Sequence, residues 1–209
     1  MNEYLASLER DLSLIEGGFK EEERRAHRDY DSRDREQALE IAHCAYRSDV
    51  YQVRMYAVFL FGYLSQEQEV LTFLRENVAQ DDNWRVQEIL AKAFDVFCAT
   101  TGYEQALSVI DEWLLHSNPN VRRAVTEELR IWTSRPYFKD RPCEAIKRLS
   151  ALRNDPSEYV RKSVGNALRD ISKRFPDLVA TELSAWDLEN TRVKQVHRLA
   201  SKFIKAVSD

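Results

Sequence analysis

A short pattern that begins with valine recurs five times along this chain of 209 residues. The valines are spaced by 33, 35, 39 and 33 residues, and each is followed by apolar positions at helical spacing. A repeat of this length holds two helices and cannot bury its apolar face alone, so consecutive copies must stack. The chain is therefore predicted to form an array of stacked helix pairs. The five copies begin at Val53, Val86, Val121, Val160 and Val193.

Helix limits follow from the apolar periodicity and from the few Gly and Pro residues. A first helix is predicted over 2–16, whereas the charged segment 20–36 is either a loop or the start of an exposed helix. The outer helices are predicted over 35–47, 66–79, 103–116, 142–153 and 176–186. The inner helices are predicted over 50–64, 83–99, 119–133, 157–174 and 190–207, and Pro136 is placed in a loop. An Asp or Asn before each valine is expected to cap its inner helix: Asp49, Asp82, Asn118, Asp155 and Asn190.

The period and the paired helices predict an all-α, HEAT-like helical-repeat solenoid, with a concave surface lined by the second helix of each pair. One such domain is predicted over residues 1–209, with about five helix pairs after an N-terminal helix. Positions 0, 4, 7 and 11 from each valine should face the core. Met55 and Phe59 are apolar at positions expected to face solvent, so another part of the chain, such as the N-terminal helix, is expected to cover them.

Composition excludes several classes of protein. The chain is 44% hydrophobic and 32% charged, and no apolar run approaches the roughly 20 residues that span a bilayer. Its first residues lack the features of a signal peptide, so a cytoplasmic protein is predicted. Cys44, Cys98 and Cys143 are expected to be reduced core thiols. Because the histidines and cysteines lack ligand spacing, and no phosphate-binding glycine loop is present, neither a metal nor a cofactor is predicted.

Charge is distributed unevenly along the chain. Residues 1–117 carry 12 Lys/Arg and 23 Asp/Glu, a net charge of −11, whereas residues 118–209 carry 19 and 12, a net charge of +7. The second part is therefore suited to a polyanionic partner, although an unevenly decorated surface would give the same imbalance.

Cationic and polar side chains of the third, fourth and fifth inner helices could follow a phosphate backbone across adjacent helices. The alternative is a solvated face with ion pairs between repeats. The candidate DNA-binding residues are Arg122, Arg123, Arg130, Arg161, Lys162, Asn166, Arg169, Lys173 and Lys194.

Trp84 and Glu88 form a second constellation, because residues four apart share a helix face. A carboxylate beside an indole could stabilise a cationic sugar, and an aromatic face attracts cations. The alternative is structural: Glu88 could pair with Arg123 of the next repeat, and Trp84 could cap the hydrophobic layer. The residues alone favour the structural alternative.

With these residues identified, the chain resembles the HEAT-like bacterial alkylpurine DNA glycosylases of the AlkC/AlkD family. The segments 118–138 and 155–179 carry the resemblance, which is closer to the AlkC branch. The resemblance implies that Trp84 and Glu88 take the places of the aromatic residue and the catalytic acid. It also implies that Arg122 and Arg123 face DNA. Asn166 stands where the AlkD branch usually has a Trp.

The resemblance implies a DNA-binding alkylation-repair protein, and a monofunctional glycosylase that hydrolyses the N-glycosidic bond of cationic N-alkylated bases. Its expected partner is double-stranded, alkylated DNA, bound by a monomer at the bacterial nucleoid. A cationic base leaves without a general acid, so Glu88 would need only to stabilise the sugar and place a water. A non-catalytic member that binds DNA structure and a protein-interaction scaffold are the alternatives.

Overall fold

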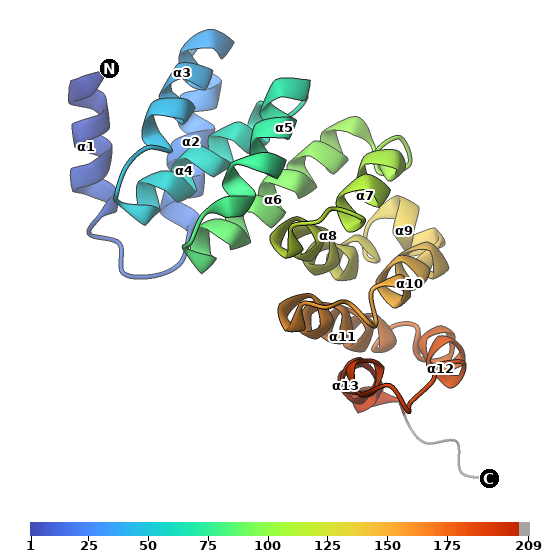
Figure 1. Cartoon of the computed structure of the whole chain (residues 1–209). Helices are drawn as coiled ribbons and strands as arrows, with labels where there is room; N and C mark the ends of the chain where they lie inside the picture. Colours follow the sequence, from blue (N-terminus) through green and yellow to red (C-terminus); the bar gives the residue numbers. More distant parts are fainter. Residues whose placement is uncertain (205–209) are drawn as a thin grey trace. The chain divides into compact units, whose positions relative to one another are not determined.

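The computed structural model describes residues 1–204, and helices joined by short loops make up this part of the chain (Figure 1). The chain divides into two compact units, Met1–Gly102 and a second unit that begins at Tyr103. Gly102 ends the last helix of the first unit with a φ of 92°, which a residue with a side chain rarely adopts. The all-α class is confirmed, and one repeat domain over residues 1–209 stays a prediction.

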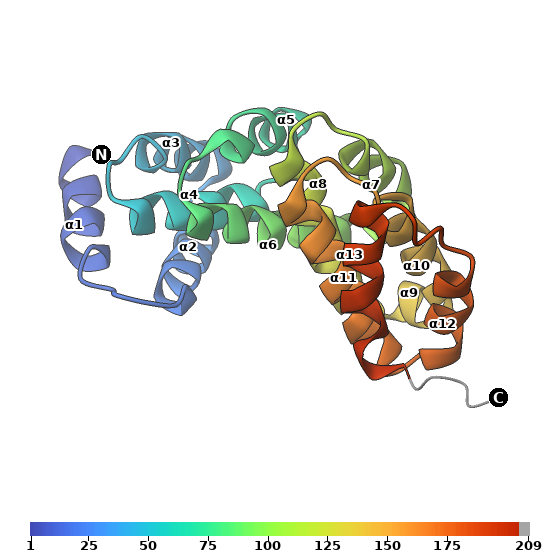
Figure 2. The same ribbon diagram turned by 60° about the horizontal axis from the view of Figure 1, so that its bottom comes forward.

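In the first unit α4 packs between α2 and α6, whereas α3 and α5 pack against another side of this row (Figure 2). A 3₁₀ turn at Val78–Gln80 precedes α6. The helices are α1 (Asn2–Leu12), α2 (Lys20–Ser32), α3 (Arg35–Ala45), α4 (Tyr51–Tyr63), α5 (Gln68–Glu76) and α6 (Trp84–Thr101).

In the second unit α11 packs between α8 and α13, and the outer helices include α10 and α12. A 3₁₀ turn at Ser201–Phe203 follows α13. The helices are α7 (Leu107–Leu114), α8 (Pro119–Trp132), α9 (Pro136–Asp140), α10 (Pro142–Ala151), α11 (Glu158–Ser172), α12 (Pro176–Ser184) and α13 (Thr191–Ala200).

Several boundaries differ from the sequence prediction. The first helix, predicted over 2–16, ends at Leu12, and the helix predicted over 103–116 begins at Leu107. The charged segment 20–36 contains the helix α2, which packs against α4 and extends the inner row. Pro136 was placed in a loop, but it opens the short helix α9, where its missing N–H costs nothing. The last inner helix was predicted over 190–207, yet α13 ends at Ala200, and residues 205–207 lie outside the described part of the chain.

The repeat valines and the positions 4, 7 and 11 residues after them are buried in the first four repeats, as predicted, whereas His197 and Ile204 of the fifth repeat are only partly buried. The four valines from Val53 to Val160 are 0% exposed, and Val193 is 5% exposed. In α8 the stripe includes Glu128, which is buried as well. The row of helices is tight at Gly62, where a Cβ atom would lie 2.9 Å from the backbone Cα of Ala93. Apolar burial along this row therefore supplies the main stabilisation of both units.

A covering element over the first repeat was predicted correctly. Met55 and Phe59 are buried, because α2 packs on α4 and the ring of Phe19 lies 6.0 Å from the ring of Phe59. The thiols fit their prediction only in part. Cys98 is buried, but Cys143 is exposed, so Cys143 is not a core thiol; all three cysteines are free.

The predicted helix caps are correct for two of the five inner helices. Asn118 and Asn190 accept hydrogen bonds from the first turns of α8 and α13. Asp49, Asp82 and Asp155 were predicted caps, and these predictions are wrong. The N-cap residues of α4, α6 and α11 are instead Val50, which gives no side-chain bond, Asn83 and Ser157. Asp155 is unavailable as the cap because its carboxylate binds an arginine of the preceding repeat.

A carboxylate is buried inside the first unit. Glu22 of α2 is 0% exposed, and neither of its carboxylate oxygens has a hydrogen-bond partner among the described residues. Burial raises the pKa of Glu22 above its ordinary value, and the neighbouring Glu21 acts in the same direction. The folded chain therefore favours the protonated form of Glu22.

This raised pKa makes the stability of the first unit depend on pH. The part of the stability that depends on protonated Glu22 is fully present below the ordinary carboxyl pKa. It is lost as the pH rises through the raised, folded-state pKa. Glu22→Gln should therefore stabilise the protein at pH 7 by about 1–3 kcal/mol and change little at pH 4. Urea unfolding at the two pH values measures this difference. Equal effects at both pH values would contradict a protonation-dependent penalty at Glu22.

Candidate nucleic-acid interface

In three of the five copies, the arginine that follows the repeat valine joins one repeat to the next. In α8 the guanidinium of Arg122 donates two hydrogen bonds to Asp155, from Nε at 2.7 Å and from Nη2 at 2.8 Å. Its Nη1 donates to the carbonyl oxygens of His116 and Ser117. Arg122 is 7% exposed, and Asp155 is 6% exposed. This buried, bidentate pair therefore fixes the loop before α8 to the loop before α11.

The same arrangement recurs elsewhere, and we call it the arginine ladder: the pairs Arg54–Asp81, Arg122–Asp155 and Arg161–Gln195. Arg54 donates to Asp81 through Nε at 2.8 Å, and its Nη1 donates to two loop carbonyls. Arg161 donates through Nε to Gln195 at 2.9 Å, and its Nη1 also donates to two loop carbonyls. The ladder holds repeats in register within each unit.

The ladder alters the predicted DNA-binding set. Arg122 and Arg161 were both predicted to contact phosphate, but their guanidinium groups bind the protein itself. Breaking the buried pair of Arg122 would leave Asp155 without its cation, which is costly. We therefore assign a structural role to these two residues and keep the others as candidate DNA-binding residues.

A separate group of cations surrounds one carboxylate on α8 and α11, and we call it the Asp170 cluster: Arg130, Arg169, Lys173 and Asp170. Lys173 donates to Asp170 at 2.8 Å, and Arg130 and Arg169 each lie 3.5 Å from it. Arg130 also lies 3.9 Å from Glu127, so the three cations face two carboxylates and the cluster keeps positive charge. Sequence reasoning missed Asp170, although its place between Arg169 and Lys173 was a usable signal.

The pKa of Asp170 reflects this surrounding charge. Partial burial opposes ionisation, but the hydrogen bond from Lys173 and the charges of Arg169 and Arg130 outweigh it and lower the pKa of the carboxyl. Asp170 is therefore ionised at neutral pH and positions the three cations.

The remaining candidates of the second unit are partly or fully exposed. Arg123 lies 3.6 Å from Glu127, and Lys162 binds Glu158 at 2.8 Å one turn away. Such exposed pairs contribute little stability, so these cations can exchange partners at low cost. Lys194 is exposed and has no ion pair with a described residue, and Asn166 is half-buried.

Trp84 and Glu88 lie on the first turns of α6 in the first unit. Trp84 is the first residue of α6 and is 55% exposed, so it does not cap the hydrophobic layer. Glu88 is exposed one turn further along. Its carboxylate has neither a hydrogen bond nor an ion pair with any described residue of this unit. The guanidinium carbon of Arg85 lies 4.3 Å from the ring centre of Trp84. The pair therefore offers solvent an unneutralised carboxylate beside an indole.

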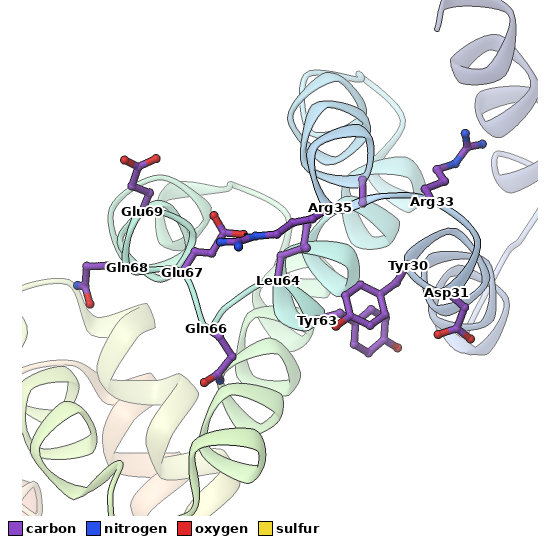
Figure 3. A pocket seen from close by; sticks show the side chains of 11 residues that line it. Tyr30, Asp31, Arg33, Arg35, Tyr63, Leu64, Gln66, Glu67, Gln68 and Glu69 are labelled. Carbon is purple, nitrogen blue, oxygen red and sulfur yellow. Dashed lines mark hydrogen bonds and ion pairs between the residues drawn. The ribbon is translucent and has the colours of Figure 1, made fainter.

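A cavity of the first unit lies elsewhere, between the ends of α2 and α4 and the start of α5 (Figure 3). It has a volume of about 820 Å³. Tyr30 and Tyr63 pack together at 5.4 Å in it, and Arg35 pairs with Glu67. Because Arg35 is neutralised and α6 contributes no lining residue, this cavity is separate from Trp84 and Glu88.

Two further features bear on the possible chemistry. No group of three or more His, Cys, Asp or Glu residues within 1–204 could hold a metal ion. No helix among the described residues has the length and hydropathy needed to cross a membrane.

Comparison with known families identifies the lineage of the chain. A model of the DNA alkylation repair enzyme family matches residues 19–203. The chain belongs to this family. The match includes both the arginine ladder and the Trp84–Glu88 pair. The DNA alkylation repair fold thus accounts for the stacked helix pairs predicted from the valine period.

Solved structures and a curated relative are also similar to this family member. AlkD2 from Streptococcus mutans is 64% identical with a TM-score of 0.97, and the match covers 98% of this chain and 99% of AlkD2. The alkylpurine DNA glycosylase AlkC from Pseudomonas fluorescens, bound to DNA containing an abasic site analog, is 24% identical with a TM-score of 0.63. That match covers 82% of this chain and 48% of AlkC. The protein YhaZ from Bacillus subtilis is 38% identical over 87 residues, which are 40% of this chain and 24% of YhaZ.

The structural assignment of Arg122 can be tested by unfolding. Arg122→Ala leaves Asp155 buried without a cation and should cost about 3–5 kcal/mol of stability. Urea denaturation measures the loss, and Arg123→Ala serves as the control because Arg123 is more exposed. An Arg122→Ala variant with wild-type stability and weakened DNA binding would show that Arg122 contacts phosphate instead.

Proposed function

We propose that this chain binds double-stranded DNA and hydrolyses the N-glycosidic bond of cationic N-alkylated bases, with Glu88 as the catalytic carboxylate. The observation that supports it best is the exposed Glu88, which has no partner among the described residues of its unit and shares a helix face with the exposed Trp84. Residues four apart on a helix are neighbours, so the carboxylate and the indole can meet the same ligand. Family membership makes alkylated DNA the expected substrate.

The chemistry requires little from the protein. When the glycosidic bond breaks, the cationic base leaves with the bonding electron pair and becomes neutral, so no general acid is needed. Positive charge develops on the sugar, where the carboxylate of Glu88 stabilises it. A water molecule attacks the sugar carbon, and its proton passes to Glu88 and then to solvent. The exposed ring face of Trp84 would attract the cationic base.

The second unit would hold the DNA backbone. We assign phosphate contacts to Arg123, Arg130, Lys162, Arg169, Lys173 and Lys194, with Asn166 as a polar neighbour. The Asp170 cluster supports this role because its cations are positioned and its charge is only partly neutralised. Guanidinium groups suit phosphate because their donors match two oxygens at once. Binding of this kind should weaken as salt is raised.

A non-catalytic DNA-binding function is the second candidate, and Asn166 favours it. This half-buried residue stands where the AlkD branch of the family usually has a Trp. The chain therefore lacks one aromatic wall that could hold a flipped or stacked base. Under this candidate the protein would bind damaged DNA without releasing the base.

Base release separates the two candidates. With duplex DNA containing N3-methyladenine, the wild-type protein should release the free base, and Glu88→Gln should lower the rate by about 10²–10³-fold. Chromatography of the released base measures the rate. The variant should keep its DNA affinity and its unfolding midpoint, because Glu88 is exposed and has no partner among the described residues of its unit.

Two other results with the wild-type protein would decide between the remaining possibilities. DNA binding without base release by the wild-type protein would leave the non-catalytic candidate. A wild-type protein with no affinity for duplex DNA at low salt would contradict both candidates.

A further inference from the structure

We propose that Arg85 and Lys92 of α6 bind the phosphates on either side of the nucleotide that faces Glu88. This inference rests on the proposed function, since it requires DNA at Glu88. It assigns phosphate contacts to the first unit, which carries 12 Lys/Arg and 20 Asp/Glu and is acidic overall. A backbone that approaches Glu88 needs local positive charge there.

The spacing places both cations beside Glu88. Arg85 precedes Glu88 by three residues and Lys92 follows it by four, so all three lie on one helix face. Ion pairs are common at both spacings. Nevertheless Glu88 pairs with neither cation, and neither cation has an ion pair with another described residue of the unit. All three charges therefore remain open to a ligand.

Aromatic rings hold Arg85 in place of a carboxylate. Its guanidinium carbon lies 4.3 Å from the ring centre of Trp84 and 5.3 Å from that of Tyr51. Tyr51 and Trp84 occupy the same position in consecutive repeats, two residues before the valine. A guanidinium that stacks on rings keeps its charge, and its N–H donors point outward from its edge. Arg85 is thus ordered without being neutralised, which suits a phosphate.

Lys92 is held in the same way. Its Nζ lies 4.4 Å from the ring centre of Phe19, the residue at the N-terminus of α2. Phe19 in turn packs against Phe59 of α4. The ammonium group is therefore positioned by the segment that covers the first repeat, and it retains its charge.

Most other arginines of the first unit are paired with a carboxylate, unlike Arg85. Arg33 lies 3.3 Å from Asp29, and Arg54 is part of the arginine ladder. Such pairs cancel their charge. Arg85 and Lys92 therefore carry positive charge on α6 itself, the helix that bears Glu88.

The separation of the two cations fits a DNA strand. Seven residues of helix rise about 10 Å at about 1.5 Å per residue. Phosphates of one strand advance about 3.4 Å along the duplex axis, so this rise corresponds to about three nucleotides. Two contacts at this distance bracket about three nucleotides, with the one that faces Glu88 among them.

The salt dependence of DNA affinity tests the proposal. Affinity of the full chain for a 20-base-pair duplex is measured by fluorescence anisotropy across a series of NaCl concentrations. Arg85→Gln and Lys92→Gln should each weaken binding and reduce the slope of log K against log salt by about 0.9. Arg47→Gln is the matched control, because Arg47 is exposed after the outer helix α3 and should leave the slope unchanged.

The outcomes are distinguishable from those of the proposed function. Slopes and affinities equal to wild type in both variants would overturn the phosphate contacts while leaving DNA binding by the second unit intact. Tighter binding of methylated duplex by Arg85→Gln would also overturn them, because Arg85 would then compete with the cationic base for Trp84. Loss of affinity in the two variants would support the contacts even if the wild-type protein released no base. Urea unfolding of each variant shows whether the fold is retained.

Discussion

The buried pair between Arg122 and Asp155 shows how one repeat is fixed to the next. Four of the five N–H donors of the arginine are used, two on the carboxylate and two on loop carbonyls. Desolvation of both charges makes the net stabilisation of such a pair small, but loss of one partner is expensive. The pair therefore acts mainly by fixing the alignment of one repeat relative to the next. It aligns the inner helices of a unit, so that side chains at equivalent positions can form a continuous surface.

This alignment separates two uses of positive charge that the sequence does not distinguish. Arginines directly after the repeat valine point into the protein and bind loops. Cations one position later, such as Arg123 and Lys162, lie at the surface in weak pairs, as do the cations of the Asp170 cluster. Neighbouring residues in the sequence thus differ: the first is bound within the protein, and the second is accessible for the phosphate contact proposed above. A count of basic residues would treat them alike.

Periodicity predicted most of the core and the paired helices, because burial depends on local spacing. The five repeat valines are 0–5% exposed. Side-chain partners could not be predicted in this way. Asp155 looked like a helix cap, but a residue of the preceding repeat determines its role. Lys92 and Phe19 are far apart in sequence, and only the packing of α2 brings them together. Trp84 is exposed, which could not be read from a pattern that equally suited a buried ring.

We assign Arg122 to a structural role and Arg123 to phosphate binding. The salt dependence of duplex affinity in an Arg123→Gln variant tests this assignment most directly. If Arg123 contacts phosphate, the slope of log K against log salt should fall by about 0.9 relative to wild type. The urea midpoint should stay the same, since Arg123 is partly exposed and only weakly paired. An unchanged slope together with a lowered midpoint would contradict this assignment and place Arg123 among the structural arginines.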